Sequence, residues 1–460
     1  MINLPPDQEH FDDSELWLQE RLEAYQLRKL RATIAYAYHN LPFYRRRFEQ
    51  AGVRPGDIKT FQDFARIPIL TKADVMAEMQ ARGSFEIGME APDTSPQPTS
   101  ICMTSGTVGT GFLRLSRGWA RPQKGAWGDS MLRVFWWAKL RPGMSLMVSP
   151  TGWHALSLLY KPLVQGMGIQ AIVPGGTFMP RFSANFLSTI MDLKPDYLDM
   201  FLPMLYAVVG ECYRRRIDPK QAFAGVQYIV TEGAALTPQA RQKLVRDLGV
   251  KDVYELAGLA ENVWGGMECS QHQGHHLMAR HSYLEVVHPQ TLKPVPPGQR
   301  GLLIGTYMDH QGSIYIRYMS QDIGEMLPGQ CGCGRTWPRF EVYDRLPNQF
   351  TVAGKQLLPY DVRLCLDDIP PLCGLPFAVI RKEGDSPHLR LAVTKLPFGD
   401  PAPLEARAIA LVKEKLGLEA HIEWVEDLPA RWKGRPVIEE REWTGGPTGP
   451  AAGPPAPMKP

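Results

Sequence analysis

Helical segments alternate with short apolar runs between residues 126 and 230, and this alternation constrains the fold more than any other feature of the chain. The apolar runs lie at residues 145–149, 171–173, 197–201 and 226–230. Helices that alternate with buried strands are typical of a layered α/β domain with much parallel sheet. Ligands of such sheets bind beyond the carboxyl ends of the strands. The polar segments 150–154 and 231–236 are therefore candidate binding loops.

The segments on either side of this region predict the domain organisation. Residues 13–52 read as two helices with a break at residues 40–44, and Thr71 is placed as the N-cap of a further helix. After residue 345 a short β/α/β block begins, and the last 17 residues are mostly Gly, Pro, Ala and Thr. We expect a large N-terminal α/β domain with mixed, largely parallel sheets over residues 1–343. A small mobile α+β domain would follow over residues 344–443, and a disordered tail over residues 444–460.

Composition excludes several classes of protein. The chain has 460 residues and a formal net charge of only +3, which predicts neither a nucleic-acid nor a membrane partner. No apolar run approaches the roughly 20 residues of a membrane span, and no signal peptide is visible. The seven cysteines are an odd number and favour a reducing, cytoplasmic setting over a disulfide framework.

Residues 104–111 form a loop rich in glycine and hydroxyl side chains. Consecutive backbone N–H groups in such a loop can bind an anion, and hydroxyls can add donors or a metal ligand. The loop lacks the Gly-Lys-Ser/Thr ending of a P-loop. Taken alone, it could equally be a surface loop.

Several further motifs follow in a characteristic order. They are Leu41-Pro42-Phe43-Tyr44, Pro68-Ile69-Leu70-Thr71-Lys72-Ala73-Asp74, Gly233-Ala234-Ala235, Gly258-Leu259-Ala260-Glu261, Arg317-Tyr318-Met319-Ser320-Gln321-Asp322 and Cys331-Gly332-Cys333-Gly334-Arg335-Thr336-Trp337-Pro338-Arg339. With the glycine loop, their order and spacing resemble the adenylate-forming acyl–coenzyme A ligases, specifically the phenylacetate–coenzyme A ligase branch. The resemblance covers most of the chain.

The resemblance implies an enzyme that joins a carboxylic acid to AMP, using ATP and Mg²⁺, and then to coenzyme A. Both reactants of the first step are anionic, so the site must neutralise and position them. It implies that Glu261 and Thr107 hold magnesium and that Asp322 binds the ribose hydroxyls. The other implied nucleotide-binding residues are Thr104, Ser105, Gly106, Gly109, Gly233, Ala234, Ala235 and Arg345. The implied acyl-pocket residues are Trp153, His154 and Gly258, and Gly354 is the implied coenzyme A contact.

Each of these residues also has an ordinary structural interpretation. Asp322 could be a turn acceptor at the end of a strand. Glu261 could be a carboxylate in the first turn of a helix, which the helix dipole favours. Trp153 and His154 could be packing residues.

A second set of residues predicts a structural zinc site. Cys331 and Cys333 are too close in sequence for a mutual disulfide, and Cys269 lies in a segment with several histidines. Three thiolates and one imidazole form a closed tetrahedral zinc site. The spacing that the branch shows indicates His276 as the fourth ligand, with His275 as the alternative. The other interpretation is buried free cysteines.

The chain also departs from the family pattern. Thr110 occupies a position where the family often has lysine, and Ala257 replaces an aromatic residue beside adenine. The C-terminal catalytic lysine is displaced, so that Lys433 and Arg435 both remain candidates for that cation. Pro347 would stiffen the hinge of the small domain.

The resemblance therefore predicts an ATP-dependent carboxylate–CoA ligase, with an aromatic acid of the phenylacetate or benzoate type as substrate. Two alternatives stay open: an adenylating enzyme that passes the acyl group to an amine, an alcohol or a carrier-protein thiol, and a catalytically reduced nucleotide-binding homologue. A homodimer is one option for its assembly.

Overall fold

The structure is a computed structural model, in which the described residues form two compact units. It describes residues 2–82, 99–103, 112–116, 126–148, 155–173, 182–259, 261, 263–309, 314–396, 400–426, 428 and 436–443. Unit 1 comprises Met1–Met200, Ala222–Glu232 and Val250–Val342, and unit 2 comprises Phe201–Gln221, Gly233–Gly249 and Tyr343–Pro460. Among the described helices, none combines the length and apolar character required to cross a membrane.

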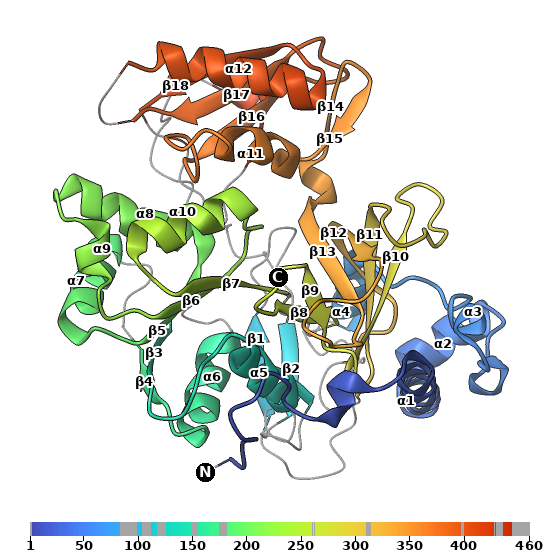
Figure 1. The fold of residues 1–460 in the computed structure, drawn as a ribbon. Coiled ribbons are helices and arrows are strands. Elements are labelled where there is room, and N and C mark those ends of the chain that lie inside the picture. Colours follow the sequence, from blue (N-terminus) through green and yellow to red (C-terminus); the bar gives the residue numbers. More distant parts are fainter. Residues whose placement is uncertain are drawn as a thin grey trace. The chain divides into compact units, whose positions relative to one another are not determined.

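One large mixed sheet organises unit 1 (Figure 1). Its strands follow the order β10-β11-β12-β13-β9-β8-β7-β6-β5-β3-β4. The strands that alternate with helices are β3 (Ser145–Val148), β4 (Gln170–Ile172), β5 (Tyr197–Phe201), β6 (Tyr228–Glu232) and β7 (Asp252–Gly258). The strands that follow are β8 (Gly265–Glu268), β9 (His275–Leu277), β10 (Ser282–Val287), β11 (Gly301–Tyr307), β12 (Tyr318–Leu327) and β13 (Arg339–Arg345).

The two halves of this sheet differ in strand direction. Strand β3 is parallel to β4 and β5, and β6 is parallel to β7. Beyond β7 the strands pair in antiparallel fashion, as β7 does with β8, β8 with β9 and β9 with β13. The predicted α/β class with mixed sheets is confirmed. The parallel part is confined to the region where helices and strands alternate, because parallel neighbours need a crossover connection.

The helices of unit 1 lie close to the predicted segments. They are α1 (Gln19–Asn40), α2 (Pro42–Gln50), α3 (Phe61–Phe64), α4 (Lys72–Arg82), α5 (Ala126–Trp137), α6 (Ala155–Gly166) and α7 (Phe182–Leu193), with the short 3₁₀ turns η1 (Asp13–Leu16) and η2 (Pro55–Asp57). Thr71 is the predicted N-cap of α4, since its hydroxyl accepts from the Asp74 N–H at 3.2 Å. Helix α2 begins at Pro42, three residues before the predicted start, because proline at the first position of a helix loses no hydrogen bond.

A buried network of charges lies inside unit 1. The Glu15 carboxylate accepts from Arg133 Nη1 at 2.8 Å and from Arg335 Nε at 2.9 Å, and all three side chains are fully buried. The Trp137 indole donates to the same carboxylate at 3.1 Å. Charges buried without partners are costly, so this network must be complete to be stable.

The same region contains a buried histidine between two carboxylates. The two ring nitrogens of His281 lie 2.7 Å from Asp129 Oδ2 and 2.9 Å from Asp309 Oδ2. Burial alone would lower the pKa of His281, but the hydrogen bonds to Asp129 and Asp309 outweigh it and raise that pKa. The two carboxylates therefore favour the imidazolium form of the ring, and Lys29, Arg280 and Arg133 surround the same carboxylates.

This arrangement predicts a loss of stability as the pH rises. The pKa of this histidine is higher in the folded state than in the unfolded state, where it is about 6.5. Its contribution to stability is therefore complete below about pH 6.5 and is lost as the pH rises through the folded-state pKa. We expect the free energy of unfolding of the wild type to fall more steeply than that of His281→Gln above about pH 6.5. Urea unfolding of both proteins at a series of pH values measures this. Parallel curves would show that His281 does not titrate differently in the folded state.

Unit 2 contains a four-stranded sheet of order β18-β17-β16-β19. These strands are β16 (Phe377–Arg381), β17 (Leu389–Thr394), β18 (Ala420–Val425) and β19 (Val437–Glu439), and the hairpin β14 (Phe350–Val352) and β15 (Lys355–Leu357) precedes them. The helices are α8 (Leu202–Arg214), α9 (Pro219–Ala222), α10 (Pro238–Leu248), α11 (Pro359–Asp367) and α12 (Ala402–Leu416), with the 3₁₀ turns η3 (Leu346–Asn348) and η4 (Glu440–Glu442). Helices α11 and α12 pack against each other, and their apolar residues share a core with the sheet.

Side-chain hydrogen bonds within unit 2 connect the start of α10 to the end of α11. The Thr237 hydroxyl donates to Asp367 Oδ2 at 2.6 Å, and Gln239 donates to Asp368 Oδ1 at 2.7 Å. Thr237 also caps α10 by accepting from the Ala240 N–H. The compact unit therefore includes helices that the sequence analysis placed in the N-terminal domain.

Candidate functional site

Several of the predicted site residues lie outside the described residues. They are Thr104, Ser105, Gly106, Thr107 and Gly109 of the glycine loop, Trp153 and His154 of the acyl pocket, and the candidate cations Lys433 and Arg435. The strands on either side of the glycine loop are described: β1 (Thr99–Met103) pairs antiparallel with β2 (Phe112–Ser116). Residues 104–111 therefore connect the two strands of a hairpin, with Met103 opposite Phe112.

Asp322 lies within an irregularity in β12. Leu302 of β11 pairs with Ile323 of β12, and Ile304 pairs with Met319. A separation of two residues in β11 therefore corresponds to a separation of four residues in β12. Gln321 has a φ of 67°, an unusual value for a residue other than glycine. Bulges of this kind redirect side chains and are frequent beside active sites. The bulge, which was not predicted from the sequence, contains the predicted ribose ligand.

Arg317 anchors the start of the same segment. Its φ is 50°, and its buried guanidinium contacts Glu285 at 3.0 Å and donates to the backbone carbonyls of Ala65 and Ile67. These bonds hold a backbone conformation that is otherwise unfavourable. The motif that begins at Arg317 is thus fixed at its start.

Glu261, the predicted magnesium ligand, lies beside this segment within unit 1. The Tyr318 hydroxyl donates to Glu261 Oε1 at 3.3 Å. Tyr318 is the first residue of β12, so one hydrogen bond joins the Glu261 segment to the strand that carries Asp322. Neither Tyr318 nor Arg317 was among the predicted site residues, although both lie in the motif Arg317–Asp322.

The predicted adenine-contacting segment Gly233-Ala234-Ala235 follows the end of β6. Gly233 has a φ of 83°, and a Cβ atom there would lie 2.5 Å from the Phe201 ring. Only glycine fits both the backbone conformation and the space. Gly258 ends β7 opposite Gly265, and Ala257, which replaces the expected aromatic residue, is a buried strand residue.

The four predicted zinc ligands lie together. The ligand atoms of Cys269, His276, Cys331 and Cys333 all lie within 4.8 Å of one another. Cys269 Sγ is 3.6 Å from Cys331 Sγ, and Cys333 Sγ is 3.3 Å from His276 Nε2. Strands β9 and β13 pair with His276 opposite Arg339, which brings the two cysteine-bearing loops together.

The donor set fits a closed zinc site. The hydrogen bond from the Cys269 thiol, and then the contact with His276, lowers the pKa of the Cys333 thiol, which favours the thiolate that binds metal. His276 Nδ1 lies 3.4 Å from the Trp337 carbonyl oxygen, a contact that leaves Nε2 facing the sulfurs. His275, the alternative ligand, instead has Glu341 and Glu255 at 3.5 and 3.8 Å. The structure therefore groups His276, rather than His275, with the cysteines.

The predicted hinge and coenzyme A residues lie in unit 2. Arg345 ends β13 and caps η3, and Arg381 Nη1 donates to the carbonyl oxygens of Pro347 and Gln349 at 3.2 and 2.9 Å. Gly354, with a φ of 74°, lies in the two-residue turn of the β14–β15 hairpin, and its N–H donates to Asp385 Oδ2.

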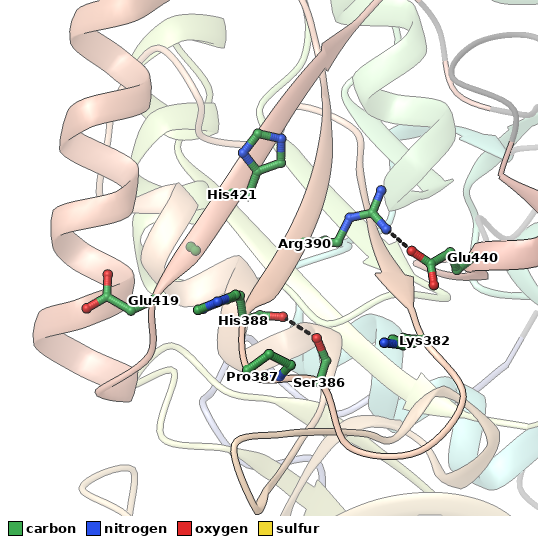
Figure 2. A pocket seen from close by; sticks show the side chains of 9 residues that line it. Lys382, Ser386, Pro387, His388, Arg390, Glu419, His421 and Glu440 are labelled. Atoms are coloured by element: carbon green, nitrogen blue, oxygen red, sulfur yellow. Dashed lines mark hydrogen bonds and ion pairs between the residues drawn. The ribbon is translucent and has the colours of Figure 1, made fainter.

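A cavity of about 450 Å³ lies at the end of the unit 2 sheet, and no motif predicted it (Figure 2). Its lining residues are Lys382, Ser386, Pro387, His388, Arg390, Glu419, Ala420, His421 and Glu440. Arg390 forms an ion pair with Glu440, and Lys413 forms one with Glu419 at 2.7 Å. These pairs balance much of the basic charge, and Figure 2 shows that the side chains do not converge on one point.

Comparisons with known proteins agree in sequence and in fold. No protein-family model matches the chain. Phenylacetate–coenzyme A ligase of Thermus thermophilus is 27% identical over 389 residues, which is 83% of either chain. The enzyme of the same name from Escherichia coli is 25% identical and covers 82% of this chain and 80% of its own.

The most informative structural match is 2-hydroxyisobutyryl-CoA ligase in complex with an acyl-AMP. The TM-score is 0.84 at 23% identity, with 96% of this chain and 94% of that chain covered. Anthranilate CoA ligase in complex with anthranoyl-AMP matches with a TM-score of 0.54 at 16% identity, over 75% of this chain and 67% of that chain. At these identities, the structural matches establish the fold. This chain is therefore a homologue of curated proteins named phenylacetate–coenzyme A ligase, and it shares the fold of solved acyl-CoA ligases.

Proposed function

We propose that the protein is an ATP-dependent carboxylate–CoA ligase that works in two steps. The first step joins the substrate carboxylate to the α-phosphate of ATP and releases pyrophosphate. The second transfers the acyl group to the thiol of coenzyme A and releases AMP. This proposal depends on the agreement between the sequence and structure comparisons. Relatives in sequence are named phenylacetate–coenzyme A ligase, and a solved acyl-CoA ligase in complex with an acyl-AMP has the same fold.

Two of the predicted nucleotide-site residues, Asp322 and Glu261, lie in unit 1. The proposal assigns the ribose hydroxyls to Asp322, since a carboxylate can accept two hydrogen bonds from a diol. It assigns a magnesium ion to Glu261, whose oxygen suits a hard cation. The hydrogen bond from Tyr318 to Glu261 supports a common role for both segments. Gly233-Ala234-Ala235 and Arg345 would contact the nucleotide, and Ser105 and Thr107 of the glycine loop would bind the phosphates.

The proposal extends to the remaining predicted residues. Trp153, His154 and Gly258 would line the acyl pocket, and Gly354 would let the pantetheine arm of coenzyme A pass close to the backbone. The names of the relatives favour an aromatic acid. The structural match to 2-hydroxyisobutyryl-CoA ligase keeps small hydroxy acids in the panel to be tested.

We also propose that Cys269, His276, Cys331 and Cys333 hold a structural zinc ion. Three thiolates and one imidazole would complete a tetrahedron and leave no position for substrate. Such a site would fix the loop after β8 to the segment after β12. It would therefore stiffen the two segments that lead from Glu261 and from Asp322.

A carboxylate-dependent ATP–pyrophosphate exchange assay tests the adenylation step. We expect exchange with at least one aromatic acid, followed by AMP and thioester formation when coenzyme A is added. Thioester formation separates this function from an enzyme that uses an amine or a carrier protein. ATP binding without exchange on any acid would instead favour the catalytically reduced homologue, which the displaced lysine and Pro347 suggest.

Alanine variants of the two candidate cations identify the one that assists adenylation. We expect either Lys433→Ala or Arg435→Ala, but not both, to lower the exchange rate by about 100-fold or more, because a cation must meet charge that develops in the transition state. Each variant serves as the control for the other, with exchange rate as the measurement. Near-normal rates in both variants would show that neither residue carries this step.

A further inference from the structure

The parallel part of the unit 1 sheet contains a buried carboxyl group, one oxygen of which has no hydrogen-bond partner among the described residues. Asp199, the third residue of β5, is only 2% exposed. Among the residues that the structure describes, its Oδ2 atom has no hydrogen-bond partner. No other carboxylate oxygen in that part of the chain is both buried and unpartnered.

Other buried carboxylates of unit 1 have hydrogen-bond or ion-pair partners within the fold, as expected for a structural role. Glu15 accepts from two buried arginines, Glu285 pairs with Arg317, and Glu268 accepts from the Glu255 N–H at 2.7 Å. A buried polar group without a partner is rare in native proteins and calls for an explanation. Asp199 therefore does not serve the fold as these residues do.

Its position in the sheet points to a ligand. Asp199 is opposite Val148, the last residue of β3, so it lies level with the carboxyl end of that strand. Strand β6 is the other neighbour of β5, and its last residue is Glu232. Ligands of parallel sheets bind at this edge of the strands. Asp199 and Glu232 therefore lie at the sheet edge where the proposed function would place an acyl substrate.

The two carboxyl groups also influence each other. Burial raises the pKa of Asp199 well above its usual range, and the nearby charge of Glu232 raises it further. Burial and the neighbouring negative charge both favour the protonated form of the Asp199 carboxyl group. The pair can then both donate and accept a hydrogen bond, as a hydroxyl or an amine on a ligand would require.

We propose that Asp199, with Glu232 beside it, is a specificity-determining residue that selects carboxylic acids carrying a hydroxyl or amino group over unsubstituted acids. This inference rests on the proposed ligase function. A site built to hydrogen-bond such a group rejects an analogue that lacks it, because the protein group is then left buried and unpaired. An acid with a methyl group in place of the hydroxyl or amino group would leave the Asp199 carboxyl group buried and unpaired.

A panel of matched acids tests the wild-type protein first. It comprises phenylacetate with a hydroxyl, amino or methyl group at each ring position, together with isobutyrate and 2-hydroxyisobutyrate. We expect at least one hydroxy or amino acid to have a kcat/KM about 10- to 100-fold above that of its methyl analogue. Equal use of hydroxy, amino and methyl acids would overturn the inference. Failure on every acid would overturn the ligase function itself.

Substitutions at position 199 then assign the preference. Asp199→Leu should reduce the ratio of the two kcat/KM values to about 1 or below, whereas Asp199→Asn, which keeps a hydrogen-bonding side chain, should retain part of it. Asp192→Asn, an exposed change at the end of α7, is the control and should leave the ratio unchanged. A purely structural role would lower kcat/KM equally for both acids and leave the ratio intact. If the leucine variant does not fold, an unchanged ratio in Asp199→Asn would contradict the assignment.

Discussion

Cys331→Ser is expected to abolish stoichiometric zinc binding and to destabilise unit 1. The cysteine is buried, and its sulfur lies 3.6 Å from that of Cys269 in the four-residue cluster. Structural zinc contributes roughly 10 kcal/mol or more to the folding of small zinc domains. A loss of even about 3 kcal/mol corresponds to a fall in Tm of roughly 5 °C or more in a unit of this size. Elemental analysis and thermal unfolding measure the two effects.

Cys212→Ser is the matched control for this experiment. Cys212 is also a fully buried free cysteine, but it lies on α8 and outside the cluster. Its replacement can lower stability slightly, but it should leave the zinc content unchanged. Wild-type protein that is purified without chelators and contains no zinc would contradict the proposed site.

Glu15→Gln is expected to cost about 3–5 kcal/mol of folding free energy, the usual effect of removing one partner of a buried ion pair. The substitution keeps the shape of the side chain but leaves the guanidinium groups of Arg133 and Arg335 facing a neutral amide. Both arginines are fully buried, so water cannot replace the lost charge. Urea unfolding gives the change in free energy.

Glu211→Gln provides the comparison at a surface site. Glu211 also contacts two arginines, Arg214 at 2.5 Å and Arg215 at 2.7 Å, but these are 65% and 38% exposed. Solvent screens such pairs, so the expected loss is about 1 kcal/mol or less. Similar losses in the two variants would show that burial does not set the strength of the Glu15 network.

Local sequence patterns predicted much of the fold, because they reflect local physics. The alternation of helices and apolar runs predicted the parallel part of the sheet, and Thr71 predicted the cap of α4. The cysteine and histidine spacing predicted a cluster that the structure brings together. In the first two cases the information is local, whereas the cluster joins Cys269 to Cys331 across 62 residues and its fourth ligand was predicted from the family resemblance.

Features that depend on distant contacts could not be predicted in this way. Glu15 meets Arg133 and Arg335 across 118 and 320 residues, and no local pattern indicates either pair. The bulge that contains Asp322 depends on how β12 pairs with β11. Asp199 did leave a signal, since it is a carboxylate within an apolar strand, but its missing partner is visible only once its neighbours are in place.

The segment that contains Glu15 is hydrogen-bonded to residues made very late in synthesis. The Trp337 indole donates to the Ser14 carbonyl oxygen at 2.7 Å, and the Thr336 N–H donates to that of Glu15 at 2.9 Å. A ribosome that adds about 5–20 residues per second needs roughly 16–64 s to cover such a separation. During that interval this segment has Arg133 and Trp137 as partners but lacks Arg335, Thr336 and Trp337. Chaperone demand and sensitivity to proteases should therefore be greatest before Trp337 emerges, and they should fall once it does.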